Sequence, residues 1–365
     1  MRILIDAVPL LVRSAGVKNY LYHWLTHLRR AAPAGTIRTL PSMGDLPPLH
    51  HDKSMAGPLK TFAGLGSLAL SNYTPLPVFD VLARSADVFH ASTLVRHPPR
   101  RPKLTATIYD MTCWLRPELH SEANLRADRT YSELLRCAAG TIAISQSSKD
   151  DAIRCLKLSP DRIRVIYPGI ADAFFDPPPH EVERVRAAYQ LTRPFVLAVG
   201  TIEPRKNVAA LIQAYAALPQ PIRDEWDLVL AGPSGWASAE TTGLLRSVRY
   251  LGYIPEGDIA PLTAAAAVFA YPSLYEGFGF PVAQAMAAGC AVITSNVSSL
   301  PEIAGDAALL IDPLSQAELT AALQRLIESP DLRAKLAALG RHRAGLFRWP
   351  DCAAQSLAFF REIAG

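Results

Sequence analysis

Short apolar runs alternate with amphipathic stretches along most of the chain. Each apolar run is long enough for one buried strand, and the stretches between runs have the 3.6-residue period of a helix. Strands that alternate with helices form parallel sheets covered on both faces, so the pattern predicts an α/β fold. In the first half the apolar runs lie at 2–11, 87–92, 104–110, 140–146 and 161–170, and helical patterns lie at 19–31 and 121–138.

The second half repeats the alternation after a Pro-rich linker, FFDPPPHE, at residues 174–181. Two alternating halves joined by a linker predict two doubly wound domains that face a cleft. Ligands of such sheets bind at the carboxyl ends of the strands. The strand-like runs of the second half lie at 195–201, 227–234, 248–254, 268–273, 291–296 and 308–313.

Residues 41–79 do not follow the alternation. Several Pro and Gly residues interrupt this stretch, and both residue types break regular elements. We expect a mobile loop here, with a partial helix over residues 67–73.

Composition narrows the class of protein. The chain has 365 residues, half of them hydrophobic, which suffices for two ordinary domains with large cores. It contains no apolar run of 18 residues, and its start, MRILIDAVPLLV, lacks the order of a signal peptide. A cytoplasmic location is therefore expected. The five cysteines are widely spaced without a CxxC pair, which favours reduced thiols over disulfides or a zinc site.

Charge is unevenly distributed. Residues 1–180 carry 22 Lys and Arg against 15 Asp and Glu, whereas residues 181–365 carry 15 against 18. Four of the cations, Arg96, Arg100, Arg101 and Lys103, cluster in RHPPRRPK. The cluster is either an ordinary surface loop or a region that attracts anionic lipid or a phosphate-bearing acceptor. A nucleic-acid partner is not expected, because no aromatic residues interleave with these cations.

Residues 271–289, YPSLYEGFGFPVAQAMAAG, predict a strand, a Gly-rich turn and a short helix that begins near Pro281 and ends at Gly289. Gly277 and Gly279 allow a ligand to approach the backbone closely. The free N–H groups of the helix start favour an anion. The same pattern also fits a tight corner without a ligand.

Four sequence blocks together resemble the family-4 glycosyltransferases of the two-domain GT-B type. They are GTIEPRKN at 200–207, LGYIPEGDIAPL at 251–262, residues 272–296 and residues 298–313. The resemblance runs along most of the chain and is weak at 41–79. It implies an acceptor-binding Rossmann-like domain over residues 1–175 and a nucleotide-sugar-binding one over 176–350. Residues 351–365 resemble the family's last helix, which packs back on the first domain.

The resemblance also implies transfer of a sugar from a nucleotide sugar with retention of configuration. Arg205 and Lys206 correspond to residues that contact the diphosphate, and two cations at that place would stabilise the growing charge of the leaving group. Glu276 would contact hydroxyls of the donor sugar without acting as a nucleophile. With these three as the catalytic residues, no essential metal or other cofactor is expected.

The chain departs from the family at Gln284, where the second of two glutamates is usual. A glutamine keeps one carbonyl acceptor for the ribose but loses the charge. Leu262 packs either on the base or in the core, and Glu302 most simply caps a helix. The loop at Ser14, Ala15 and Gly16 corresponds to a glycine loop over the phosphates. The expected donor-binding residues are Gly16, Thr201, Gly252, Tyr253, Ile254, Leu262, Gly277, Phe278, Gly279 and Gln284.

Three residues of the first half are expected to bind the acceptor: His90, Tyr109 and Asp110. Many relatives have His where Tyr109 stands, and a tyrosine is a poor base at neutral pH. His90 is either a polar group facing the cleft or a satisfied buried histidine. Asp110 either orients a neighbour or caps the following turn.

The resemblance is closest to bacterial mannosyltransferases of surface-polysaccharide assembly, which suggests a hexosyltransferase that uses GDP-mannose. UDP- and dTDP-sugars remain open as donors. The expected acceptor is a glycan or a lipid-diphosphate-linked saccharide, and peripheral contact with an anionic membrane is expected on its inner face. The alternatives are another nucleotide-sugar enzyme, such as an epimerase, or a non-catalytic binder of sugar nucleotides.

Overall fold

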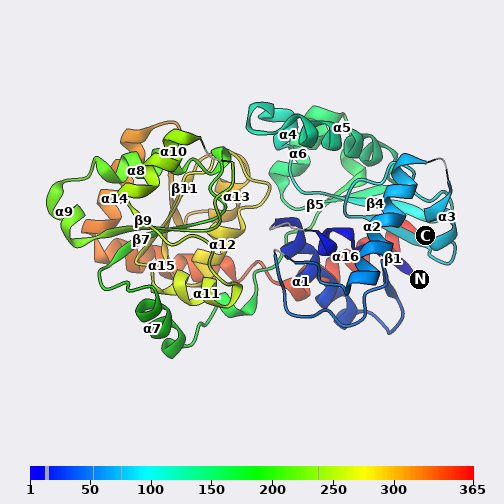
Figure 1. Ribbon diagram of the computed structural model, residues 1–365, viewed down its shortest axis with the longest axis horizontal. Coiled ribbons are helices and arrows are strands. Elements are labelled where there is room, and N and C mark those ends of the chain that lie inside the picture. Colours follow the sequence, from blue (N-terminus) through cyan, green and yellow to red (C-terminus); the bar gives the residue numbers. More distant parts are fainter. Residues whose placement is uncertain (13–15, 52, 75, 237) are drawn as a thin grey trace. The chain divides into compact units, whose positions relative to one another are not determined.

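The computed structural model describes residues 1–12, 16–51, 53–74, 76–236 and 238–365, and Figure 1 shows it as a ribbon. The chain divides into two compact units. Unit 1 contains Met1–Gly169 and Arg348–Gly365, and unit 2 contains Ile170–Phe347. Each unit has one six-stranded sheet whose paired strands are all parallel, with helices around it. The predicted fold class, two doubly wound parallel-sheet units, is confirmed.

Unit 1 has the strand order β2-β1-β3-β4-β5-β6. Its core packs apolar side chains of the strands, such as Leu4, Phe89 and Ile108, against the flanking helices. The strands are β1 (Ile3–Asp6), β2 (Ile37–Leu40), β3 (Val88–Ala91), β4 (Lys103–Ile108), β5 (Gly140–Ala143) and β6 (Ile163–Val165). The α-helices are α1 (Gly16–Ala31), α2 (Pro58–Tyr73), α3 (Val78–Leu82), α4 (Thr112–Leu115), α5 (Glu122–Cys137), α6 (Gln146–Leu156) and α16 (Trp349–Ala364).

The stretch at 41–79 differs from its prediction. Residues 67–73 are helical as predicted, but the helix already begins at Pro58, and α2 has 16 residues. Gly64 lies so close to Leu11 and Pro41 that a Cβ atom there would be 2.7 Å from the Leu11 side chain. Two glycines inside a helix lower its intrinsic propensity, and tertiary packing of this kind compensates for the loss.

The C-terminal helix α16 belongs to unit 1, although it follows unit 2 in the sequence. It packs along α1, where Trp24 Nε1 donates to Ser356 Oγ over 2.9 Å. It also approaches β5 at Gly140, where a Cβ atom would be 2.7 Å from Ile363.

Unit 2 has the strand order β12-β11-β10-β7-β8-β9. Strand β9 has only two residues, against the seven predicted at 248–254. The strands are β7 (Phe195–Val199), β8 (Asp227–Ala231), β9 (Arg249–Tyr250), β10 (Val268–Tyr271), β11 (Ala291–Ser295) and β12 (Ala308–Ile311). The α-helices are α7 (Pro179–Ala188), α8 (Val208–Ala216), α9 (Gln220–Glu225), α10 (Ala239–Leu244), α11 (Glu256–Ala265), α12 (Phe280–Ala287), α13 (Leu300–Ala304), α14 (Gln316–Glu328) and α15 (Pro330–Ala344).

The strand order reverses once in each sheet. In unit 1 successive strands are added on opposite sides of β1, so the reversal lies between β1 and β3. In unit 2 it lies between β7 and β10. Helices that leave the sheet in opposite directions open a crevice at such a point, and ligands of doubly wound sheets bind there at the carboxyl ends of the strands.

Candidate functional site

Two loops of unit 2 meet where its strand order reverses. The loop after β7 contains Arg205, whose carbonyl oxygen accepts from the Leu274 N–H over 2.8 Å. The Arg205 guanidinium in turn donates to the Tyr275 carbonyl over 3.0 Å. These bonds hold the backbones of the two loops together.

Glu276 lies at the centre of this contact and is 7% exposed. Its Oε2 is 2.7 Å from Arg205 Nη1, and its Oε1 is 2.7 Å from Lys206 Nζ. The second amino group of Arg205 pairs with Glu203 Oε1 over 2.7 Å. The three predicted catalytic residues therefore lie together, and Glu203 joins them as a residue that was not predicted.

Two further unpredicted residues complete the cluster. Tyr271, the last residue of β10, donates its hydroxyl to Glu276 Oε1 over 3.0 Å and accepts from Lys206 Nζ. Ser273 donates to the same oxygen over 2.7 Å. Both residues lie in the YPSLYEG segment at the carboxyl end of a predicted strand, and this position could have identified them as site residues.

The charged side chains of the cluster shift the pKa values of their neighbours. Burial alone would raise the pKa of Glu276, but the charges of Arg205 and Lys206 and the bonds from Lys206 and Ser273 lower it to about 2. Burial lowers the pKa of Lys206, and the Glu276 carboxylate opposes that effect. Glu276 is therefore charged at neutral pH, and both of its carboxylate oxygens are engaged.

The start of α12 lies next to this cluster in the sequence. Gly279 precedes the helix with φ of +93°, a conformation that favours glycine, and a Cβ atom there would be 2.7 Å from Leu300. Phe278 is buried against Phe280 and Phe347. The Glu276 backbone is fixed by Ser298 and Ser299, which bond its N–H and its carbonyl.

The remaining donor-binding predictions of unit 2 have mixed outcomes. Tyr253 is half exposed, and Gly252 before it has φ of +70°. Gln284, in α12, and Thr201, after β7, are partly exposed. Ile254 is 4% exposed and Leu262 is fully buried, so the structure places Leu262 in the core and not on a base. Glu302 is the third residue of α13, and its carbonyl accepts from Arg343.

His90 differs from its acceptor-binding prediction. It lies in β3 with no exposed surface, and its two ring nitrogens are each 3.0 Å from the hydroxyls of Thr105 and Thr107. Burial lowers its pKa to about 3, so the ring is neutral. Trp24 and Phe360 pack on it. His90 is therefore a satisfied core residue, the alternative that its sequence context left open.

Tyr109, after β4, also differs from the acceptor-binding prediction, and Asp110 makes the capping bonds that its sequence context left open. The Tyr109 hydroxyl is buried and has no hydrogen-bond partner among the residues that the structure describes. Asp110 Oδ1 accepts from the N–H and the hydroxyl of Thr112 over 2.8 and 2.7 Å, so its side chain caps the start of α4. The Tyr109 hydroxyl is therefore turned away from solvent, whereas Asp110 is partly exposed.

Tyr109 lies near buried polar side chains at the point where the strand order of unit 1 reverses, and burial together with the charge of Asp6 raises its pKa. Asp6 ends β1 and Ser92 follows β3; in the described part of the chain Asp6 Oδ2 and Ser92 Oγ are buried without a hydrogen-bond partner. Burial raises the pKa of Asp6 to about 7, against a weaker opposing effect of the Val8 N–H, which donates to Asp6 Oδ1 over 3.0 Å. Neither Asp6 nor Ser92 was predicted from the sequence as a site residue.

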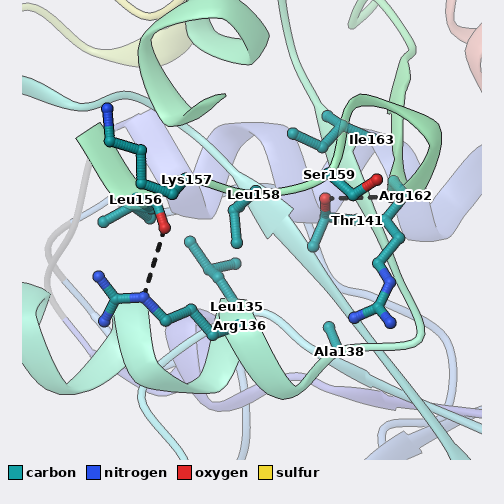
Figure 2. A pocket seen from close by; sticks show the side chains of 10 residues that line it. All are labelled: Leu135, Arg136, Ala138, Thr141, Leu156, Lys157, Leu158, Ser159, Arg162 and Ile163. Atoms are coloured by element: carbon teal, nitrogen blue, oxygen red, sulfur yellow. Dashed lines mark hydrogen bonds between the residues drawn. The ribbon is translucent and has the colours of Figure 1, made fainter. Parts of the chain in front are cut away.

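Gly16 is the first residue of α1 and is exposed, with open space where a Cβ atom would lie. The expected loop members Ser14 and Ala15 lie outside the described residues. Figure 2 shows a separate hollow of about 280 Å³ in unit 1, where Arg136 donates to the Leu156 carbonyl and the Thr141 hydroxyl to the Arg162 carbonyl. The hollow contains none of the predicted site residues.

Comparison with known proteins gives matches over both units. Residues 15–174 match the family model "Glycosyltransferase Family 4", and residues 181–343 match "Glycosyl transferases group 1". The O-antigen chain mannosyltransferase B of Escherichia coli is 34% identical over 274 residues, which cover 73% of this chain and 72% of that protein. The serotype-specific mannosyltransferase WbdA of Escherichia coli is 29% identical over 62% of this chain, which spans only 29% of that longer protein.

A solved structure supports the fold. The structure of HepE from Anabaena in complex with UDP-glucose superposes with a TM-score of 0.74 at 21% identity, covering 98% of this chain and 99% of HepE. At that identity the similarity shows the two-unit architecture and no more.

Proposed function

This chain belongs to glycosyltransferase family 4 and is a group 1 glycosyltransferase, and from that membership we propose that it transfers mannose from GDP-mannose to a saccharide acceptor in polysaccharide assembly. The Arg205, Lys206 and Glu276 cluster supports the donor site, because it places two cations where the strand order of unit 2 reverses. The two mannosyltransferase relatives support the sugar. An epimerase or a non-catalytic binder is not favoured.

The two cations are proposed to hold the diphosphate of the donor. A guanidinium can grip phosphate oxygens in a bidentate manner, while the ammonium supplies a compact charge. Glu276 and Glu203 pair with these cations and hold their charges in a fixed orientation. Negative charge grows on the leaving diphosphate as the glycosidic bond breaks, and fixed cations stabilise it without reorganisation. We propose on this basis that no metal is required.

Retention is proposed to follow a same-face displacement, in which the leaving phosphate takes the acceptor proton. Glu276 Oε1 is engaged by Lys206, Tyr271 and Ser273, and its Oε2 by Arg205. A carboxylate whose two oxygens already bind four groups is a weak nucleophile. We propose that Glu276 orients Lys206 and contacts donor hydroxyls.

The acceptor is proposed to be a glycan or a lipid-diphosphate-linked saccharide, reached from the inner face of the membrane. No helix in the described ranges is long and apolar enough to cross a membrane. We propose peripheral contact with an anionic membrane.

Binding of GDP, UDP, ADP and dTDP, measured by calorimetry, tests the donor site. We expect GDP to bind most tightly and Lys206→Ala to weaken it at least tenfold, or about 1.4 kcal/mol. Lys335→Ala, an exposed lysine of α15, is the matched control and should leave binding unchanged. Preference for another base would refute the GDP-mannose proposal alone, and absence of binding by every nucleotide would refute the donor site.

A further inference from the structure

The outer face of α2 is apolar along its whole length. Its residues recur at the spacing of one helical face, yet they are exposed where a helix of a water-soluble domain carries polar groups. Leu59 is 87% exposed, Phe62 is 82% exposed and Tyr73 is 81% exposed. The buried residues of the helix, Gly64 and Ser71, lie on another face. The apolar face consists of Leu59, Phe62, Ala63, Gly66, Ala69, Leu70 and Tyr73.

The apolar surface continues into the next helix. Leu76 follows α2, Val81 and Leu82 lie on α3, and all three are exposed. The two helices pack together in the blue-to-cyan part of the ribbon (Figure 1). We call this surface, from Leu59 to Leu82, the apolar patch. An exposed apolar surface of this extent marks an interaction site.

The basic stretch at 96–103 is fastened beside the apolar patch by two side chains. Asn72 of α2 donates to the Leu94 carbonyl over 3.1 Å and accepts from the Arg96 N–H over 2.8 Å. Asp80 of α3 accepts from the Arg100 N–H over 2.7 Å. The Arg96 guanidinium lies 5.6 Å from the centre of the Tyr73 ring. Cations therefore border the apolar patch on the structure and not only in the sequence.

The charge around the apolar patch is strongly positive. Segment 57–103 contains six Lys and Arg residues and two Asp residues, and the balance of +4 equals that of the whole chain. Within the described ranges the guanidiniums of Arg100 and Arg101 have no side-chain or carbonyl partner, and both are exposed. The six cations are Lys60, Arg84, Arg96, Arg100, Arg101 and Lys103.

We propose that the apolar patch and the basic stretch dock unit 1 on an anionic lipid bilayer, with α2 lying in the interface and the cations against the head groups. Aromatic and aliphatic side chains on one side of a helix, bordered by Lys and Arg, are the composition of an interfacial helix. Phe62 and Tyr73 suit the depth where aromatic rings collect. A second copy of the chain fits less well, because two surfaces of charge +4 would face each other.

This inference rests on the proposed function, because a lipid-linked acceptor gives a transferase reason to lie on a bilayer. Flotation of the full chain with vesicles tests it. We expect flotation with phosphatidylcholine vesicles that contain phosphatidylglycerol, weaker flotation with phosphatidylcholine alone, and loss of the difference at high salt. Leu59→Gln with Phe62→Gln should lower the bound fraction at least tenfold. Both side chains are exposed, so folding should be unaffected.

Matched variants separate this surface from general stickiness. Leu314→Gln, an equally exposed leucine of unit 2, should float like the unaltered chain. Arg100→Glu with Arg101→Glu should lower binding to anionic vesicles, whereas Arg325→Glu with Lys335→Glu in unit 2 should not. Phe62→Trp should show a blue shift of its fluorescence with anionic vesicles.

Two outcomes would overturn the inference. One is unchanged flotation of the Leu59→Gln, Phe62→Gln variant. The other is that light scattering shows a dimer of the unaltered chain and a monomer of this variant. Nucleotide binding is measured in parallel, so that its loss reports on the donor site. If the chain binds a nucleotide but does not float with vesicles, the membrane-docking proposal is refuted and the proposed function is not. If the chain floats but binds no nucleotide, the proposed function is refuted and membrane docking is not.

Discussion

The two sheets place different chemistry at the same topological position. At the reversal of unit 2, four groups engage the carboxylate of Glu276, which is charged at neutral pH. At the reversal of unit 1, Asp6 is buried with an unpartnered oxygen and a pKa of about 7. The position is given by topology, but the ionisation of the carboxyl group is set by the cations around it.

The two strand-order reversals also differ in the polar groups that surround them. The reversal in unit 2 brings two cations, Arg205 and Lys206, against two carboxylates, whereas the reversal in unit 1 contains hydroxyl groups and one carboxyl group. Hydroxyl-bearing side chains that lack partners are costly in a protein interior, so they require water, a ligand or strain as an explanation.

The largest expected effect is the loss of transfer activity when a cation of the unit 2 cluster is removed. Lys206→Ala should lower kcat/KM by about 10²–10³-fold, because it removes one of the two cations proposed to stabilise the negative charge that develops on the leaving group. Steady-state transfer assays measure the loss, and Lys335→Ala provides the exposed-lysine control. A change in KM alone would mean that Lys206 contributes to binding and not to the transition state.

The second effect concerns Asp6 and depends on pH. Its folded pKa, about 7, lies above the ordinary value of 3.8, so the stability that it contributes is present at low pH and falls as the pH rises through 7. Between pH 5 and 8 the unaltered chain should lose ~2–3 kcal/mol relative to Asp6→Asn, which stays neutral. Urea unfolding at both pH values measures the difference, and parallel curves for the two proteins would show that Asp6 is charged throughout.

Glu276 should respond to pH in the opposite sense. Its folded pKa, about 2, lies below the ordinary value of 4.5, so its contribution is complete above that value and is lost as the pH falls toward 2. Glu276→Gln should therefore remove part of the acid sensitivity of unit 2 between pH 4.5 and 2. Acid titration of near-ultraviolet circular dichroism for both proteins measures it, and identical titrations would contradict the ion-pair assignment.

A smaller effect is expected at Gln284. Gln284→Glu restores the carboxylate that is usual in the family and adds an acceptor for ribose hydroxyls, so nucleotide affinity should rise several-fold, by about 1 kcal/mol. Calorimetry with GDP measures the rise. Unchanged affinity would indicate that the residue does not contact the ribose.

The smallest effect is expected at Tyr109. Removal of its unpartnered hydroxyl in Tyr109→Phe should leave transfer unchanged and raise stability by up to about 1 kcal/mol. Thermal unfolding and a transfer assay measure both quantities. A large loss of transfer would instead mean that the hydroxyl turns toward the acceptor during the reaction.

Much of the molecule could be read from the sequence. The spacing of apolar residues is a local property that is visible along the chain. It therefore predicted the two alternating halves, their parallel sheets, and the strand ends that carry Arg205, Lys206 and Glu276. The Pro- and Gly-containing stretch before β3 was misjudged, because α2 depends on contacts of Gly64 with Leu11 and Pro41 that no local pattern contains.

The tertiary structure alone decided which polar groups meet. Tyr271, Ser273 and Glu203 join the cluster because two loops far apart in the sequence are bonded to each other. His90 and Tyr109 lie at or after strand ends, as the sequence indicated, but their polar atoms turn inward. Position along a strand is determined by chain order, whereas the direction and the charge of a side chain depend on neighbours that only folding brings together.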